Sequence, residues 1–201
     1  LDASPTGVGH ARTAAVQAGL ALPGVLGAMV RLPFANGAFA SVLSLFTAFG
    51  YFSTVEDNQL PVNEISRVLV PAGHWFLDYL DADALREELG DGRPRSRERE
   101  AGCLSVEETR SLSPDGCRVV KRVTLRPLPG EERTAAELGV GHEGLRYDES
   151  VVLFTRGELD AMAGRCGLEP VAAAGGYEGQ PIGAGNRWIL VYRKIPEGVR
   201  T

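Results

Sequence analysis

The side chains of this sequence that could do chemistry lie just after apolar segments, and they do not form a recognisable reactive motif. Asp78 lies near the end of the apolar run Trp75–Leu80. A carboxylate at the end of a buried strand can act as a general base or orient a bound molecule. Asp78 could equally cap a helix at Ala82–Leu89. The other candidates for contact with a substrate are Phe49, Tyr51, Tyr79, Tyr147 and Tyr177.

Histidine and cysteine, which often serve as metal ligands and nucleophiles, form no pattern in the sequence. His10, His74 and His142 are scattered, and each is expected to be structural or exposed. The 3 cysteines are widely spaced and form neither a zinc pattern nor a disulfide framework. Tyr51 could border a bound ligand, although packing as an ordinary aromatic residue is favoured. Residue types alone therefore predict no metal site and no catalytic set.

The composition is that of an ordinary soluble globular chain. Its 201 residues are enough for one sizeable domain, or for one domain with an elaborated insertion. Lys and Arg number 21 against 26 Asp and Glu, and the net charge of −5 disfavours a nucleic-acid backbone as partner. Apolar runs are interrupted well short of about 20 residues, so no membrane span is expected. The unpaired cysteines indicate a reduced, cytoplasmic setting. A homodimer is possible.

The middle of the first half of the chain has the layout of a parallel α/β unit. An apolar strand is predicted over Phe39–Phe46, with apolar residues on both faces. After an uncharged linker, the spacing of apolar residues predicts a helix over Val62–Leu69, with Asp57 as its N-cap. Pro71–Gly73 ends that helix, and a second buried strand follows over His74–Leu80.

Helical and charged segments flank this unit. Ser4 and Pro5 predict the start of a helix over Thr6–Ala18, because Ser is a good N-cap and Pro fits the first turn. A short strand is expected within Leu20–Val30. Residues 81–99 are predicted to be a charged helix followed by an Arg-rich loop, both solvated.

From Leu104 onwards apolar residues alternate with polar ones, as they do in antiparallel strands. Pro114–Gly116 supplies the turn of a β-hairpin, and Tyr147–Thr155 is a further strand. The segment Pro127–Gly144 is polar and Gly-rich, and we expect it to be a long connection. An antiparallel insertion of about three strands is therefore predicted.

The C-terminal part is predicted to close the sheet with an antiparallel hairpin. Thr155 and Glu158 have the spacing of a capping box, which predicts a helix start. The segment between the predicted strands Leu168–Ala174 and Arg187–Arg193 is too short and too rich in glycine for a crossover helix. These two strands should therefore be antiparallel neighbours.

The predicted fold class is α/β: a three-layer Rossmann-like sheet with a C-terminal antiparallel hairpin and an antiparallel β insertion. Residues 1–90 and 150–195 would form a partial α/β core, and residues 100–155 an inserted region that caps the substrate. The segment Leu1–Pro5 has the sequence of a strand end that turns into a helix, so we expect the fold to be truncated at its N-terminus.

Three segments carry a resemblance to a known family: LPFANGAFASVLSLFTAFGYF, SRVLVPAG and HWFLDYLD. They resemble the core of the class I S-adenosylmethionine-dependent methyltransferases, most closely the small-molecule members with a β-rich insertion. The resemblance implies S-adenosylmethionine as cofactor and transfer of a methyl group to a small-molecule acceptor. Such folds bind their ligands at the carboxyl ends of the strands. Few motif residues are expected, because methyl transfer depends mainly on positioning.

The resemblance also assigns cofactor-binding positions. Asp2 matches the acidic residue that holds the ribose hydroxyls of the cofactor. Ala28 stands where a carboxylate normally accepts a hydrogen bond from the adenine amino group, so that bond is absent, whereas Met29 can pack on the adenine ring. The other positions that match cofactor-binding residues of the family are Ala3, Ser44, Leu45 and Phe46.

The sequence departs from the family pattern upstream of Asp2. No GxGxG turn follows a strand anywhere in the chain, and the first strand, the first helix and most of the second strand are missing. We therefore interpret the chain as a fragment of a methyltransferase that binds the cofactor poorly. The alternative is a non-catalytic methyltransferase-like module for binding or assembly. The missing turn favours it, as do Ala28 and Ala40, which stand where the family has carboxylates.

Overall fold

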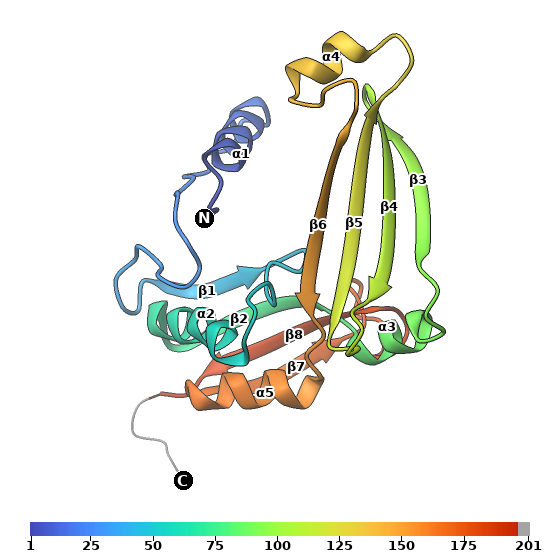
Figure 1. Cartoon of the computed structure of the whole chain (residues 1–201). Helices are drawn as coiled ribbons and strands as arrows, with labels where there is room; N and C mark the ends of the chain where they lie inside the picture. Colours follow the sequence, from blue (N-terminus) through green and yellow to red (C-terminus); the bar gives the residue numbers. More distant parts are fainter. Residues whose placement is uncertain (197–201) are drawn as a thin grey trace.

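A computed structural model describes residues 1–196, which form two four-stranded sheets (Figure 1). The core sheet contains, in spatial order, β1 (Phe39–Ser44), β2 (Leu69–Leu80), β8 (Arg187–Lys194) and β7 (Leu168–Ala174). The inserted sheet contains β3 (Arg95–Ala101), β4 (Leu104–Leu112), β5 (Arg118–Pro127) and β6 (Leu145–Val152). The helices are α1 (Pro5–Gln17), α2 (Val55–Val68), α3 (Ala82–Leu89), α4 (Glu132–Glu137) and α5 (Arg156–Arg165). Within residues 1–196, no helix has the length and apolar character needed to cross a membrane.

The core sheet is part parallel and part antiparallel, which confirms a Rossmann-like sheet with a C-terminal hairpin. Strands β1 and β2 run parallel and are joined through α2, the crossover that a parallel pair needs. Strand β8 is antiparallel to β2, and β7 is antiparallel to β8. The inserted antiparallel sheet extends away from the core sheet. Helix α3 lies at its near end and α4 at its far end (Figure 1).

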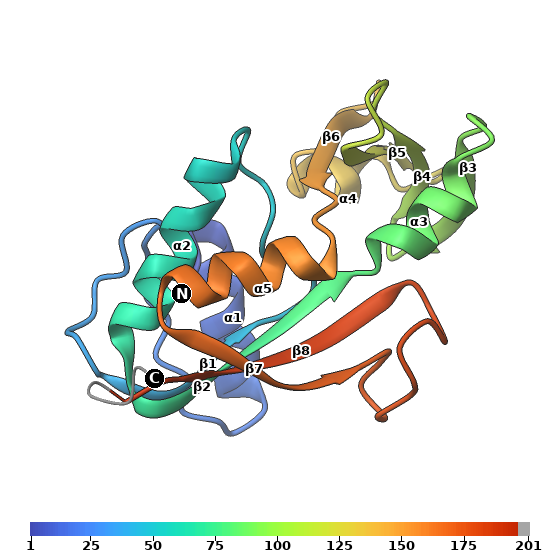
Figure 2. The same ribbon diagram turned by 90° about the horizontal axis from the view of Figure 1, so that it is seen from below.

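Helices α2 and α5 pack on one face of the core sheet, where Figure 2 shows them side by side. Trp75, Leu77 and Tyr79 alternate along β2 and are almost completely buried in this interface, because every second residue of a strand faces the same side. Val62 and Ile65 supply the helix side of the contact. The 3,4 spacing of apolar residues in α2 thus identified the buried stripe correctly.

Helix α2 begins earlier than its apolar spacing indicates. Its N-cap is Thr54 and not Asp57, because the Thr54 hydroxyl accepts a hydrogen bond from the Asp57 N–H at 3.0 Å. The first turn carries no apolar stripe, so periodicity could not reveal it. The next strand also starts early, at Leu69, and passes through Ala72 at a φ of 61°.

Three other predictions of secondary structure were wrong. The Arg-rich loop before Arg99 contains β3, so the inserted sheet has four strands. Its alternating Arg and Glu residues give no apolar signal, as is typical of a charged edge strand. The connection Pro127–Gly144 contains α4. Within Leu20–Val30, a single bridge joins Leu26 to Asp2 in place of the predicted strand.

The loop before β1 is attached to α2 by an ion pair. The Glu64 carboxylate accepts the Leu32 N–H at 2.7 Å and lies 2.7 Å from the Arg67 Nε. The Arg67 guanidinium also donates to the carbonyls of Leu32 and Phe34, at 3.0 and 2.8 Å. The hydrogen bond from Arg67 holds the pKa of Glu64 below its usual value of 4.5.

This lowered pKa predicts a pH-dependent stability. Because the folded state binds the Glu64 proton more weakly than the unfolded state, the contribution is complete above the unfolded-state pKa. It is lost as the pH falls through the folded-state pKa. We expect Glu64→Gln to lower the free energy of unfolding by about 1–2 kcal/mol at pH 7 and by much less at acid pH, as urea unfolding at both pH values would measure. An equal effect at both pH values would contradict this account.

Candidate functional site

The linker from β1 to α2 carries two consecutive residues in the left-handed region. Phe46 has a φ of 54° and Thr47 a φ of 58°. Residues other than glycine rarely adopt this conformation, and it persists only where surrounding contacts hold it. The linker follows the carboxyl end of β1, where α/β folds of this kind bind ligands.

The buried carboxylate of Asp78 holds this linker in place. Its Oδ2 accepts the backbone N–H of Phe46 at 2.7 Å. The same carboxylate accepts hydrogen bonds from the Tyr177 hydroxyl and the Arg187 guanidinium. Partial burial and the bond to Asp78 raise the pKa of Tyr177, so its hydroxyl stays protonated and donates. Asp78 thereby connects the linker to the C-terminal hairpin.

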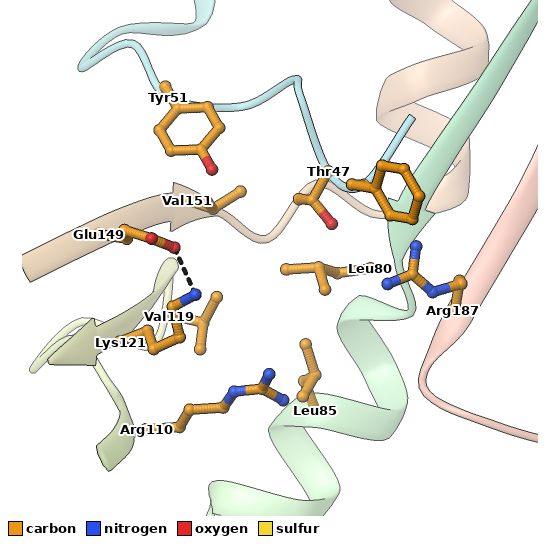
Figure 3. Close-up of a pocket in the computed structure, with 11 residues that line it drawn as sticks. Thr47, Tyr51, Leu80, Leu85, Arg110, Val119, Lys121, Glu149, Val151 and Arg187 are labelled. Atoms are coloured by element: carbon orange, nitrogen blue, oxygen red, sulfur yellow. Dashed lines mark ion pairs between the residues drawn. The ribbon is translucent and has the colours of Figure 1, made fainter. Parts of the chain in front are cut away.

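A pocket of about 180 Å³ lies between this linker and the inserted sheet (Figure 3). Part of its lining is apolar, from β2, α3 and the inserted sheet. Tyr51 and Glu149 lie at one side, and Arg187 lies opposite them (Figure 3). The lining residues are Phe46, Thr47, Tyr51, Leu80, Leu85, Arg110, Val119, Lys121, Glu149, Val151 and Arg187.

Three charged side chains reach this pocket from one row of the inserted sheet. Arg110, Lys121 and Glu149 lie opposite one another on β4, β5 and β6, so they share one face. The Lys121 Nζ is 2.7 Å from a Glu149 carboxylate oxygen. Burial and then the charge of Glu149 raise the pKa of Tyr51, which keeps its hydroxyl protonated at neutral pH. Apolar contacts with a few polar groups suit a small polar molecule.

A second cavity, of about 490 Å³, lies beside β1 and is mostly apolar. Met29 and Ser44, two of the predicted cofactor-binding residues, line it. The Ser44 hydroxyl also accepts the indole N–H of Trp75 at 3.1 Å. Of the other two predicted residues at this end of β1, Phe46 lines the first pocket and Leu45 is partly exposed.

The remaining predicted cofactor-binding residues lie in the N-terminal segment. The Asp2 carboxylate accepts the Ser4 N–H at 2.7 Å at the start of α1. Within the described part of the chain, this is the one hydrogen bond of the Asp2 side chain. Ala3 is exposed. The carbonyl of Ala28 accepts a backbone N–H in a turn, and its methyl side chain offers no acceptor to a ligand.

The structure places the predicted substrate residues in different settings. Tyr51 lines the pocket, whereas Asp78 and Tyr177 contact Phe46 and Arg187, which line it. Tyr147 lies on the same face of β6 as Glu149, two residues before it, and is 43% exposed outside the pocket lining.

Two predicted substrate residues belong to the core, so their prediction was wrong. Phe49 is 2% exposed and packs edge-on against the rings of Trp75 and Tyr79. Tyr79 is fully buried, its hydroxyl donates to a carbonyl of β6, and burial raises its pKa. The alternative that Asp78 caps α3 was also wrong, because Asp81 is the N-cap of that helix.

Sequence reasoning missed all four charged residues that line the pocket. Arg110 and Lys121 could have been paired from the hairpin, because the Pro114–Gly116 turn fixes which residues of β4 and β5 lie opposite each other. Arg187 and Glu149 carry no such local signal. Their position depends on how the inserted sheet and the C-terminal hairpin meet the linker.

Comparisons with known proteins agree with this architecture. Residues 1–77 match a family model described as a methyltransferase domain. A solved S-adenosylmethionine-dependent methyltransferase from Clostridium acetobutylicum superposes with a TM-score of 0.77 at 11% identity, over 96% of this chain and 73% of that one. The chain therefore has the fold of these methyltransferases. No curated protein sequence matches it.

Two further solved structures with the same fold are described as sugar methyltransferases. An amino pentose methyltransferase from Micromonospora echinaspora, involved in calicheamicin biosynthesis, has 21% identity and a TM-score of 0.60, over 95% of this chain and 71% of that one. A sugar N-methyltransferase from a Streptoalloteichus species has 17% identity and a TM-score of 0.66, over 96% and 69%. At these identities the likeness concerns the fold.

Proposed function

We propose that the chain binds S-adenosylmethionine at the carboxyl ends of its core strands and transfers the methyl group to a small-molecule acceptor in the pocket. One observation carries the proposal. In a methyltransferase fold, the pocket lies directly against the linker after β1 and is covered by the inserted sheet. The amino pentose and sugar N-methyltransferases of the same fold support an acceptor of small size.

Residues at two places fit this cofactor. The exposed Asp2 carboxylate accepts one hydrogen bond among residues 1–196, so its second oxygen can accept from ribose hydroxyls. Met29 and Ser44 line a cavity of about 490 Å³, within the size range of small-molecule sites, and its apolar lining suits an adenine ring. The other residues proposed to contact the cofactor are Ala3, Ala28, Leu45 and Phe46.

When bound, this cofactor supplies the methyl group from its sulfonium. The residues of the chain contribute mainly position, since in-line transfer needs little acid–base chemistry. Phe46 and Thr47 form the boundary between the cofactor side and the acceptor pocket. The Tyr51 hydroxyl and the Glu149 carboxylate line the pocket, where they can hydrogen-bond the group that accepts the methyl.

The proposal predicts where S-adenosylhomocysteine perturbs the protein. We expect addition of this product, at millimolar concentration, to shift the backbone amide NMR signals of Asp2, Met29 and Ser44–Thr47. Asp2→Asn should weaken the binding by up to about tenfold, because it replaces a charged acceptor by a neutral one. Asp57→Asn, at an exposed position of α2, should leave the affinity unchanged.

Perturbations at millimolar concentration detect weak binding as well as tight binding. If the shifts are absent, or are confined to residues far from the carboxyl ends of β1 and β2, the proposed cofactor site is wrong. A non-catalytic module predicts this negative result.

A further inference from the structure

Arg110 differs from the other charged residues of its row because it has no charged partner. Among residues 1–196, its guanidinium forms neither an ion pair nor a hydrogen bond with another side chain. Lys121, directly opposite on β5, is paired with Glu149 at 2.7 Å. Arg95, opposite on β3, is paired with Asp91 at 3.1 Å. Arg110 nevertheless lines the pocket, and Figure 3 shows its side chain extending toward Leu85.

The pocket carries a local excess of positive charge. Arg110, Lys121 and Arg187 line it together with the carboxylate of Glu149. Lys121 is paired with Glu149 and Arg187 with Asp78, so the uncompensated charge is that of Arg110. This positive charge stands in a chain whose net charge is −5. Cations placed directly opposite each other, as Arg110 and Lys121 are, destabilise a sheet. A bound anion would offset that repulsion.

The shape of the Arg110 guanidinium indicates which anions fit the pocket. A guanidinium presents a planar fork of donors that matches a carboxylate or a phosphate with two parallel hydrogen bonds. Leu80, Leu85 and Val119 give the pocket an apolar side next to this fork. An acceptor with an anionic end and an apolar or neutral body would therefore satisfy both parts of the lining.

We propose that the inserted sheet holds an anion subsite at Arg110, flanked by Lys121, which binds a carboxylate or phosphate of the methyl acceptor. The assignment of this anionic group to the methyl acceptor rests on the proposed function, whereas the anion subsite itself does not. Binding of the anionic end at β4 and β5 leaves the other end of the molecule toward Tyr51 and Phe46, on the cofactor side. The subsite thus sets the orientation of the acceptor as well as its class.

The test uses two anions of defined chemistry, pyrophosphate and succinate, in the absence of cofactor. Each is titrated at low ionic strength while the amide NMR signals of β4 and β5 are followed. We expect at least one of them to bind the wild-type chain and to shift the signals of Arg110 and Lys121. Tighter binding of pyrophosphate indicates a phosphate subsite, and tighter binding of succinate indicates a carboxylate subsite.

Matched variants separate the subsite from the general charge of the sheet. Arg110→Gln should weaken binding by about tenfold, because it removes a charge-assisted pair of hydrogen bonds. Arg110→Lys keeps the charge without the fork and should weaken it less. Arg126→Gln removes the same charge from the opposite face of β5, where Arg126 pairs with Glu107, and should change the affinity less than twofold.

Equal losses in Arg110→Gln and Arg126→Gln, or no binding to the wild-type chain at millimolar anion, would overturn the subsite. This result is independent of the cofactor experiment. Anion binding without perturbation by S-adenosylhomocysteine would reject the proposed function and leave the subsite. Perturbation by S-adenosylhomocysteine without anion binding would reject the subsite and leave the proposed function.

Discussion

Replacing Asp78 by asparagine is expected to lower the free energy of unfolding by about 3 kcal/mol. The Asp78 side chain has no exposed surface, and the Arg187 guanidinium that it pairs with is 32% exposed. Asparagine keeps an acceptor for the Phe46 N–H but leaves the guanidinium without a compensating charge. Removal of one partner from such a pair costs more than the pair itself contributes, because the remaining charge stays poorly solvated. Urea unfolding at neutral pH would measure the loss.

The matched control for this variant is Asp148→Asn. Asp148 also pairs with an arginine, Arg122 at 2.9 Å, but both side chains are exposed, at 44% and 57%. Exposed pairs contribute little, so the control should change the free energy of unfolding by less than about 1 kcal/mol. Similar losses in the two variants would show that burial of Asp78 does not matter.

The Asp78 variant should also change the linker. Without the charged acceptor, the Phe46 N–H is held less firmly, and the left-handed conformations of Phe46 and Thr47 lose part of their support. Hydrogen exchange of the Phe46 amide should therefore become faster than global unfolding alone explains. Unchanged protection of this amide would indicate that the linker is held by other contacts.

Replacing Leu77 by alanine is expected to lower the free energy of unfolding by about 3–4 kcal/mol. Leu77 has no exposed surface and lies in the contact between the core sheet and the helices that cover it. The substitution removes buried methyl groups and leaves a cavity, and both effects destabilise the fold. Thermal or urea unfolding of the variant measures the combined cost.

Leu43→Ala serves as the comparison for this core substitution. Leu43 lies on the neighbouring strand β1, opposite Phe76, and is 60% exposed. Truncation there should change the free energy of unfolding by about 0.5 kcal/mol or less. A large loss at Leu43 would show that this face of the sheet is covered in solution.

Local signals in the sequence were sufficient for several elements of the fold. The capping box at Thr155 and Glu158 is formed, with the Thr155 hydroxyl accepting the Glu158 N–H at 3.3 Å. The Pro114–Gly116 turn and the short connection after Ala174 correctly predicted two antiparallel pairs. Each of these signals acts between residues that are close in the chain, so one sequence can reveal it. The same reasoning failed for β3, whose alternation of Arg and Glu resembles a solvated loop.

The candidate site depended much more on tertiary structure. Asp78 could be singled out as a carboxylate at a strand end, but its partners Tyr177 and Arg187 lie 99 and 109 residues further along the chain. Their convergence depends on the pairing of β2 with β8. Phe49 and Tyr79 looked equally suitable for substrate contact, because residue type does not distinguish an aromatic side chain that is buried from one that lines a pocket.

The sequence by itself determined an α/β chain with an antiparallel insertion, because ordered apolar segments and turns carry that information locally. Only the tertiary structure decided which charges meet. Arg110 and Lys121 come from one hairpin, but whether each finds a partner depends on Glu149 and on the packing of the inserted sheet against the linker. Charge pairing and burial are properties of distances across the fold, and sequence spacing does not give those distances.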